Sequence, residues 1–551
     1  MQNTKLKKAL RAFADNGINL VLLSILTGLF AGVVVTFYNI LASIGEHTAE
    51  KLYALILGNP AFIPVLFLGL AAGGIVIGTF VRFVPMIRGS GIPQIEGASR
   101  GIIRFKWYVT MCSMFAASLA CVFMGLSAGA EGPSLEIGGC AGEAVGATLR
   151  RSQMVRRLQI ASGSSAGLAV AFNAPITGLV FAMEEAFRSF SPQVFVCAAI
   201  SVVTSLFTRN LIRPAIGYGT GFTFENFTFA EFSLGSCLWA IPAALVTALA
   251  GVAFYYSVFG AKKFFKHINF LKGAGKFIFV FLIAGNFALI TSYAIGGGHS
   301  FISALASGDG AIEVEKVFGI SVALSLVIIV VIRFIAAAMN MACGVPCGVF
   351  IPMLAVGAGI GALLSLLFQK MGMNGAYSDY IVIICMSVFF TAIVKAPITG
   401  VVMVFELTGQ FTNFLPALLG IAVGYLVSML FKVQPIYERN LEEFIETEKI
   451  YVNVRKEKVS LLITPDSKAD GAKIRALIWP TNGLVVQIIE PDGKITVPDG
   501  ETVMHAGSTL VFECETTSRE ELINYLVSIV GKQPEEQEGS NADAMENIET
   551  E

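Results

Sequence analysis

The stretch GAEGP, residues 129–133, lies inside one of the most apolar regions of the chain. Working back from Glu131, the first charged residue is Lys106. A carboxylate in hydrocarbon is energetically unfavourable, so an acid at this place predicts a function. Proline is favoured in the first turn of a helix, and Pro133 follows two residues after the acid. GAEGP therefore predicts a helix that starts with Glu131 at its N-terminus.

The composition around this stretch predicts an integral membrane protein. The chain has 551 residues, of which 55% are hydrophobic and 14% are charged, whereas soluble domains carry about 25% charged residues. Several apolar runs approach the roughly 20 residues that span a bilayer: 20–38, 62–81, 277–294 and 317–339. The first run lacks a small-residue cleavage site and further spans follow it, so we do not expect a removable signal peptide. The 56 glycines suit close packing of helices in a membrane.

Local clusters of charge predict the orientation of the chain in the membrane. The net charge of −1 indicates no particular partner and gives no sign of nucleic-acid binding. Basic residues cluster before the first apolar run and between two later runs: Lys5, Lys7, Lys8 and Arg11, then Lys262, Lys263, Lys266, Lys272 and Lys276. Cytoplasmic loops of membrane proteins carry excess Lys and Arg. We therefore expect a protein of the cell membrane, with both clusters and both chain termini in the cytoplasm. The nine cysteines and four histidines form no ligand cluster, and no metal or cofactor is predicted.

The apolar part contains two related halves, about 20–210 and 230–440. NAPITGLVFAMEE at 173–185 is similar to KAPITGVVMVFEL at 395–407, and Ala174 and Ala396 in these stretches lie 222 positions apart. A weaker match aligns Gly129 with Gly344, 215 positions apart. Duplicated halves are typical of transporters, whose sites lie where broken helices meet. The sequence alone leaves open whether the halves are inverted.

The composition changes after Tyr437. Residues 438–458 are charged and predict a helix and a linker, with 446–455 as the linker itself. Residues 456–530 contain β-branched runs separated by Pro-Asp-Gly turns, followed by an amphipathic helix at 518–530, which predicts a small cytoplasmic α/β domain. The acidic tail at 531–551 is expected to be disordered.

Four breaks bearing Gly or Pro interrupt the membrane part. They are GSGIP at 89–93, GAEGP at 129–133, GVPCGVFIP at 344–352 and QPIYERN at 434–440. A helix N-terminus carries about half a positive charge and unpaired N–H groups. Several such ends would bind an anion without a buried Lys or Arg. A single break would be explained as a kink, but four, two of them with hydroxyls (Ser90 and Tyr437), favour a site.

These segments, with AFNAPITGLVFAMEE at 171–185 and APITG at 396–400, resemble the CLC chloride channel and transporter family in order and spacing. The resemblance covers about 20–445, within a transport domain placed at 1–445. It implies a mainly α membrane protein with an inverted-repeat fold of broken helices. It also implies a homodimer in which each subunit has its own pore.

The resemblance also implies roles for individual residues. Glu131 corresponds to the gating glutamate, which occupies the anion site when ionised and swings out when protonated. Glu185 falls where the family's antiporters hold an internal proton-transfer glutamate, whereas Glu184 is expected to be structural. The residues implied to bind chloride are Ser90, Gly91, Ile92, Ala130, Gly132, Val349, Phe350, Ile351 and Tyr437.

Three positions depart from the family pattern. The family usually has Arg at Ala130, commonly Glu at Gln94 and often Ala at Ile351. Loss of the Arg removes positive potential beside the outer mouth, which puts rate and coupling in doubt. Ser90, by the same resemblance, predicts chloride as the transported anion, with bromide and nitrate tolerated.

The C-terminal domain resembles the TrkA-C (RCK-C) regulatory domain over about 456–530. Such domains dimerise, and some bind small ligands, including cyclic dinucleotides, so a nucleotide is a candidate ligand. The alternative is a cap that stabilises the dimer and binds nothing.

The leading interpretation is a Cl⁻/H⁺ antiporter in a lipid membrane, and the runner-up is a passive gated chloride channel. Glu185 discriminates between the two, because the family's passive channels typically carry an apolar residue there. A cation transport component is suggested only by the TrkA-C-like domain and by AIGYG at 215–219, which is similar to a K⁺ filter. Arg213 and Pro214 before it predict a turn instead. No enzyme motif is present at a suitable spacing, so an enzyme is not predicted.

Overall fold

The computed structural model describes residues 2–187, 192–219, 227, 234–268, 272–306, 317–408, 414–450, 455–465, 467–477, 479–480, 483–516 and 519–533. The chain divides into two compact units. The larger one, here called the helical unit, comprises Leu20–Tyr451. The smaller one comprises Met1–Asn19 and Val452–Glu551.

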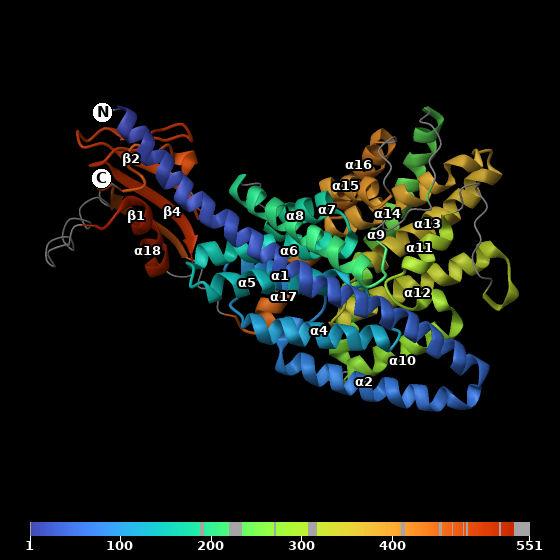
Figure 1. The fold of residues 1–551 in the computed structure, drawn as a ribbon. Helices are drawn as coiled ribbons and strands as arrows, with labels where there is room; N and C mark the ends of the chain where they lie inside the picture. Colours follow the sequence, from blue (N-terminus) through green and yellow to red (C-terminus); the bar gives the residue numbers. More distant parts are fainter. Residues whose placement is uncertain are drawn as a thin grey trace. The chain divides into compact units, whose positions relative to one another are not determined.

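The helical unit is built of α-helices of unequal length (Figure 1). In chain order these are α1 (Gln2–Gly58, which begins in the smaller unit), α2 (Ile63–Phe83), α3 (Ile92–Ser99), α4 (Trp107–Phe123), α5 (Glu131–Thr148), α6 (Gln153–Phe172), α7 (Pro175–Phe181), α8 (Pro192–Ala215), α9 (Leu234–His267), α10 (Gly275–Ile290), α11 (His299–Leu305), α12 (Val322–Cys343), α13 (Phe350–Lys370), α14 (Ser378–Val394), α15 (Pro397–Thr408), α16 (Phe414–Leu430) and α17 (Ile436–Thr447). A π-helical turn, η3 (Ala182–Phe187), follows α7 directly.

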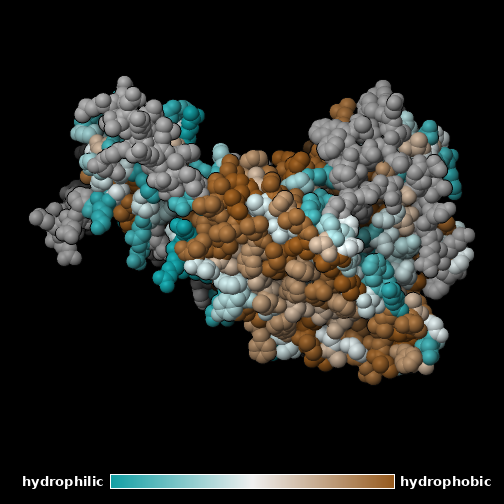
Figure 2. Space-filling model, viewed as in Figure 1, coloured by the Kyte–Doolittle hydropathy of each residue, from teal (hydrophilic) through white to brown (hydrophobic). Residues whose placement is uncertain are grey.

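The surface of this unit suits a bilayer. Within the described residues, seven helices are long and apolar enough to cross a membrane. Large apolar side chains are exposed on several of these helices, for example Leu68 on α2, Val203 on α8 and Leu238 on α9. Figure 2 shows hydrophobic residues covering much of the visible face. The prediction of a membrane protein is therefore supported by where its apolar residues lie.

Each of the four predicted breaks precedes a helix. α3 begins at Ile92, α5 at Glu131, α13 at Phe350 and α17 at Ile436, so the helix starts predicted from Gly and Pro are confirmed. Proline lies in or next to the first turn in every case, where its missing N–H leaves no acceptor unsatisfied. α3 and α17 are short, with 8 and 12 residues.

Small residues allow helices of the core to touch through their backbones. Gly142 of α5 lies so close to the Gln159 carbonyl of α6 that a Cβ could not be accommodated, and Gly138 meets Gly163 in the same way. At the other side of the core, the ring of Phe350 packs between Phe172 and Phe390, with centroids 4.7 and 4.6 Å away. The middle of α5 and the start of α13 are thus held in tightly packed surroundings.

The two halves repeat at the level of helices. α7 and α15 begin at Pro175 and Pro397, 222 positions apart, as the APITG match predicted. The weaker match was wrong in register, because α5 and α13 begin 219 positions apart. Gly129 faces Gly348, the second glycine of GVPCG, and not Gly344, which ends α12 in a left-handed conformation with φ +80°.

The smaller unit contains the predicted α/β domain. Its antiparallel sheet has the order β1 (Arg455–Leu462), β4 (Thr509–Thr516), β2 (Gly483–Ile489), β3 (Ile495–Thr496). The helix α18 (Arg519–Val530) follows β4, and Leu526 packs with Leu510 and Phe512 in a buried core. Residues 451–454 of the linker and 534–551 of the tail lie outside the described residues.

Candidate anion site and its flanking pockets

Three of the four interrupted segments meet at their helix starts. Gly129 and Gly348 exchange two backbone hydrogen bonds, with N–O distances of 2.8 and 2.7 Å. Gly132, in the first turn of α5, packs on Ser90, where a Cβ would lie 2.6 Å from the Ser90 carbonyl oxygen. Glycine is required for that approach. The sequence therefore brings the starts of α3, α5 and α13 to one place.

The fourth segment brings Tyr437 to the same region. α17 packs against α3, and the Tyr437 ring is fully buried. It lies edge-on to Phe181 with centroids 6.3 Å apart, and Phe181 in turn contacts Phe350 of α13. The Tyr437 hydroxyl has no hydrogen-bond partner among the residues that the structure describes. Buried hydroxyls normally have one, so this donor suits an anion as its acceptor.

Helix geometry adds further donors. The first N–H groups of a helix have no acceptor within the helix, and the helix dipole makes that end positive. The residues predicted to bind chloride all lie at such ends: Ser90, Gly91 and Ile92 at α3, Ala130 and Gly132 at α5, Val349, Phe350 and Ile351 at α13, and Tyr437 at α17. Gly91 adopts φ +76° directly before α3, a conformation that favours glycine.

Glu131 is the first residue of α5, and its side chain is 3% exposed. One carboxylate oxygen, Oε2, lies against Gly129, where a Cβ would collide with it. The other, Oε1, lies 3.6 Å from Nε2 of His299, the first residue of α11. The acid that the sequence singled out therefore sits at a helix N-terminus, beside a histidine.

Glu131 lines a cavity of about 580 Å³, here called the Glu131 pocket. Its other charged or titratable lining residues are Glu46, His47, Glu50, Arg209, Arg213 and His299. Arg209 donates to the Asn173 side chain and Arg213 to the Gly219 carbonyl, so both guanidinium groups are engaged away from Glu131. Two further acids, two imidazoles and two guanidinium groups thus line the pocket around the Glu131 carboxylate.

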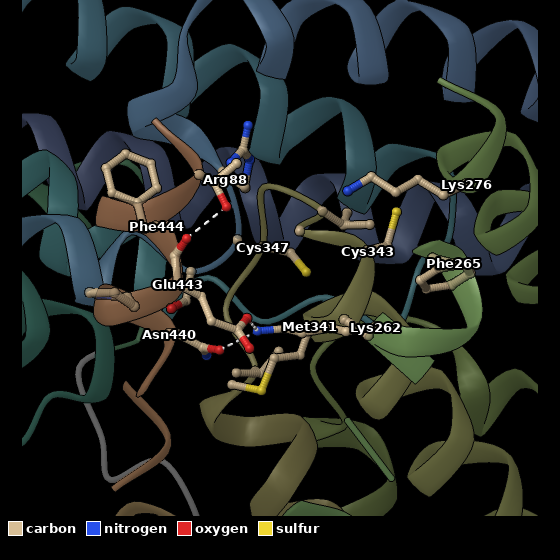
Figure 3. Close-up of a pocket in the computed structure, with 18 of the residues that line it drawn as sticks. Arg88, Lys262, Phe265, Lys276, Met341, Cys343, Cys347, Asn440, Glu443 and Phe444 are labelled. Carbon is tan, nitrogen blue, oxygen red and sulfur yellow. Dashed lines mark hydrogen bonds and ion pairs between the residues drawn. The ribbon is translucent and has the colours of Figure 1, made fainter. Parts of the chain in front are cut away.

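A second cavity, of about 370 Å³, approaches the site at Ser90 and is here called the Arg88 pocket. It is lined by five basic residues: Arg88, Lys262, Lys266, Lys272 and Lys276. Lys262 of α9 donates to Asn440 and Glu443 of α17, at 2.6 Å each (Figure 3). Arg88, two residues before Ser90, pairs with Glu448 at 2.8 Å. These ion pairs tie α17, which carries Tyr437, to α9 and to the segment of Ser90.

The adjacent acids Glu184 and Glu185 differ in their surroundings. Both carboxylate oxygens of Glu184 accept backbone hydrogen bonds at the start of α15, from Ile398 at 3.0 Å and Thr399 at 2.7 Å. Glu184 therefore caps a helix, in agreement with its expected structural role. Glu185 is buried on the same π-helical turn, which packs against α3. π-turns often mark functional positions.

Two residues escaped the sequence reasoning. Glu406 accepts from the backbone of Ile176 and Thr177 at the start of α7, so it repeats in the first half what Glu184 does in the second. The sequence contained a signal for Glu406, because Glu184 and Glu406 are separated by the same 222 positions as the two APITG motifs. His299 had no such signal, since only the fold brings it to Glu131.

AIGYG is a helix C-terminal turn. α8 ends at Ala215, Gly217 has φ +81°, and the Tyr218 N–H bonds to the Arg213 carbonyl at 2.9 Å. The turn predicted in place of a K⁺ filter is confirmed.

Residues 73–429 match the sequence model of a family described as voltage gated chloride channel, which is more than half of the chain. The chain belongs to this family. Residues 459–527 match the TrkA-C domain model.

Individual relatives agree with this membership. The chain is 27% identical over 446 residues to the H(+)/Cl(-) exchange transporter ClcA of Vibrio cholerae, covering 78% of this chain and 91% of the relative. It is 28% identical to the ClcA of Yersinia pestis, with 70% and 78% covered. The crystal structure of a slow cyanobacterial Cl⁻/H⁺ antiporter superposes with a TM-score of 0.69 at 24% identity, covering 78% of this chain and 99% of that one. The helical unit therefore has the CLC fold, an inverted repeat of broken helices.

Proposed function

We propose that this protein exchanges chloride for protons across a membrane. The observation that carries the proposal is Glu131. It is the first residue of a helix at the proposed anion site and lines one pocket, while Gly132 packs on Ser90, which lines the other. An ionised carboxylate at a helix N-terminus competes with an anion for the same donors, and a protonated one does not. One side chain thereby links the chloride path to proton binding.

The other proposed roles follow the path. Ser90 and Tyr437 donate hydroxyl hydrogen bonds to a central chloride, together with the N–H groups of Gly91 and Ile92. The N–H groups of Ala130, Gly132, Val349, Phe350 and Ile351 line the adjoining anion positions. Glu185, buried on the turn that packs against α3, passes protons on the side away from the Glu131 pocket. Ser90 favours chloride, with bromide and nitrate tolerated.

The membrane orientation and the assembly are also proposed. By the positive-inside rule, the basic residues of the Arg88 pocket and the separate cluster of Lys5, Lys7, Lys8 and Arg11 lie on the cytoplasmic side, and both chain termini are proposed to lie in the cytoplasm. The protein forms a homodimer with one pore in each subunit. The TrkA-C domain regulates transport, with a nucleotide such as a cyclic dinucleotide as its candidate ligand.

Purified protein in liposomes tests the exchange. With an imposed chloride gradient, the wild type should drive protons against their own gradient, and Glu131→Ala should abolish proton movement while chloride flux persists. Glu50→Gln is the matched control, because it removes an acid from the same pocket away from the helix start. Chloride flux in the wild type with no proton movement would replace the exchanger by a passive chloride channel. Coupled proton transport by Glu131→Ala would refute the role of Glu131.

A further inference from the structure

The titratable partner of Glu131 comes from a glycine-rich loop. Residues 295–299 read IGGGH and lead into α11. Gly296 and Gly298 have φ +64° and +106°, which side chains disfavour. The Gly296 N–H donates to the Leu126 carbonyl at 3.0 Å, and Leu126 lies three residues before Gly129. The loop is thus fastened to the segment that leads into α5.

A buried arginine forms hydrogen bonds with the backbone of this loop. Arg333 of α12 is fully buried and donates to the carbonyls of Gly297 and Ile295, at 3.2 and 3.3 Å. A Cβ at Gly298 would lie 2.6 Å from its Nη1 atom. Because these contacts fix the backbone next to His299, the imidazole position beside Glu131 is set by the fold. His299 is partly exposed to the Glu131 pocket, so it can exchange protons with solution.

We propose that His299 is a positioning residue of the gate, whose imidazolium holds the ionised Glu131 carboxylate and makes gating depend on the pH of the Glu131 pocket. The family usually has a permanently charged Arg beside the gating acid, at the position of Ala130. Here a histidine, a residue type whose ordinary pKa lies near neutrality, places Nε2 of His299 3.6 Å from Oε1 of Glu131. The proposal rests on the proposed function, because it requires Glu131 to be the gate.

The charged groups around the imidazole set the sign of the effect. Glu131 of α5 lies beside the imidazole of His299. Glu46 and the His47–Glu50 pair of α1 line the same pocket, and Arg333 donates to the backbone of the loop that carries His299. Arg209 and Arg213 of α8 have other partners. A charged His299 attracts the ionised carboxylate and holds it at the anion site, so chloride flux should begin at a lower pH than it would beside a neutral side chain.

The test is the pH dependence of chloride flux, varied only on the side of the Glu131 pocket. His299→Gln should raise the half-activating pH by about half to one unit, since a partly exposed ion pair is weaker than a buried one. His299→Lys, which keeps a positive charge at all pH values tested, should lower flux at neutral pH instead. His47→Gln is the matched control: it lines the same pocket but pairs with Glu50 and not with Glu131, so it should shift the profile far less than His299→Gln.

A double variant separates this inference from the function beneath it. Glu131→Gln should be insensitive to pH, and adding His299→Gln should change nothing further. If Glu131→Gln keeps the wild-type pH profile, the proposed gate fails. If Glu131→Gln removes the pH dependence but His299→Gln and His299→Lys both match the wild type, only the role of His299 is overturned. A similar shift in His47→Gln would likewise overturn it.

Discussion

The two pockets of the helical unit reach neighbouring residues, but the side chains that line them differ in chemistry. The Arg88 pocket is lined by five basic side chains and reaches Ser90. The Glu131 pocket is lined by three acids, two histidines and two arginines, and it includes Glu131 itself. Gly132 packs on Ser90, so the two pockets end at neighbouring backbones. One side presents only basic groups besides Glu443, and the other combines two arginines with five groups that can change charge with pH.

This difference predicts that the two sides contribute unequally to anion capture and proton binding. A basic cavity raises the local concentration of anions and does so at any physiological pH. A pocket rich in carboxylates and imidazoles holds protons in numbers that depend on pH. In an exchanger both ions must be able to enter or leave on each side, but the lining of one side can favour one of them. The predictions below test this difference, beginning with the largest expected effect.

Proton transport should be lost when Glu185 alone is changed. Glu185→Gln removes the proposed proton carrier on the turn that packs against α3, so proton movement should fall to background while chloride flux persists. Glu184→Gln is the matched control, since its carboxylate caps α15 through Ile398 and Thr399. It should lower thermal stability but keep coupled transport. Uphill proton movement by Glu185→Gln in chloride-loaded liposomes would contradict the assignment.

Chloride binding should weaken when both hydroxyls are removed. A hydrogen bond to a charged group contributes about 1.5–3 kcal/mol, so Ser90→Ala with Tyr437→Phe should weaken binding by at least about 100-fold. Phe keeps the ring that packs on Phe181. Calorimetric titration of chloride measures the change, and Tyr256→Phe, which removes a hydroxyl bonded to the Phe431 carbonyl, is the control. Equal affinity in the double variant and the wild type would place the anion elsewhere.

The sequence predicted the parts of this site that depend on local chemistry. Gly and Pro mark helix starts because of their backbone geometry, so the starts of α3, α5, α13 and α17 were located from sequence. The APITG repeat likewise predicted the 222-residue spacing of α7 and α15. Contacts between distant segments leave no such mark. His299 reaches Glu131 only through the loop that Arg333 holds, and neither residue carries a motif.

A smaller effect is expected from neutralising one permanent positive charge of the Arg88 pocket. Lys262 and Arg88 are paired with Glu443 and Glu448, so Lys276 is the more informative residue to neutralise. Lys276→Gln should slow chloride uptake from this side by about two- to fivefold at low ionic strength, and salt should erase the difference. Lys263→Gln changes the same charge on an exposed residue outside the pocket lining and is the control. A loss that persists at high salt would indicate a structural role for Lys276.

The smallest effect is expected from removing the TrkA-C domain. Every candidate site residue from Ser90 to Tyr437 lies in the helical unit, and α17 is held there by Glu443 and Glu448. Truncation after Lys449 keeps both ion pairs, so coupled exchange should stay within about twofold of wild type, as for changes remote from a site. Glu448→Gln in the full chain releases the Arg88 contact and should make transport more sensitive to the domain, because small shifts of α17 move Tyr437.

A ligand regulates only if it binds two arrangements of the domain differently. Thermal shifts of the intact protein across a panel of nucleotides detect such binding. A folded but inactive truncation would refute dispensability, whereas full activity with no thermal shift would leave the domain a stabilising cap.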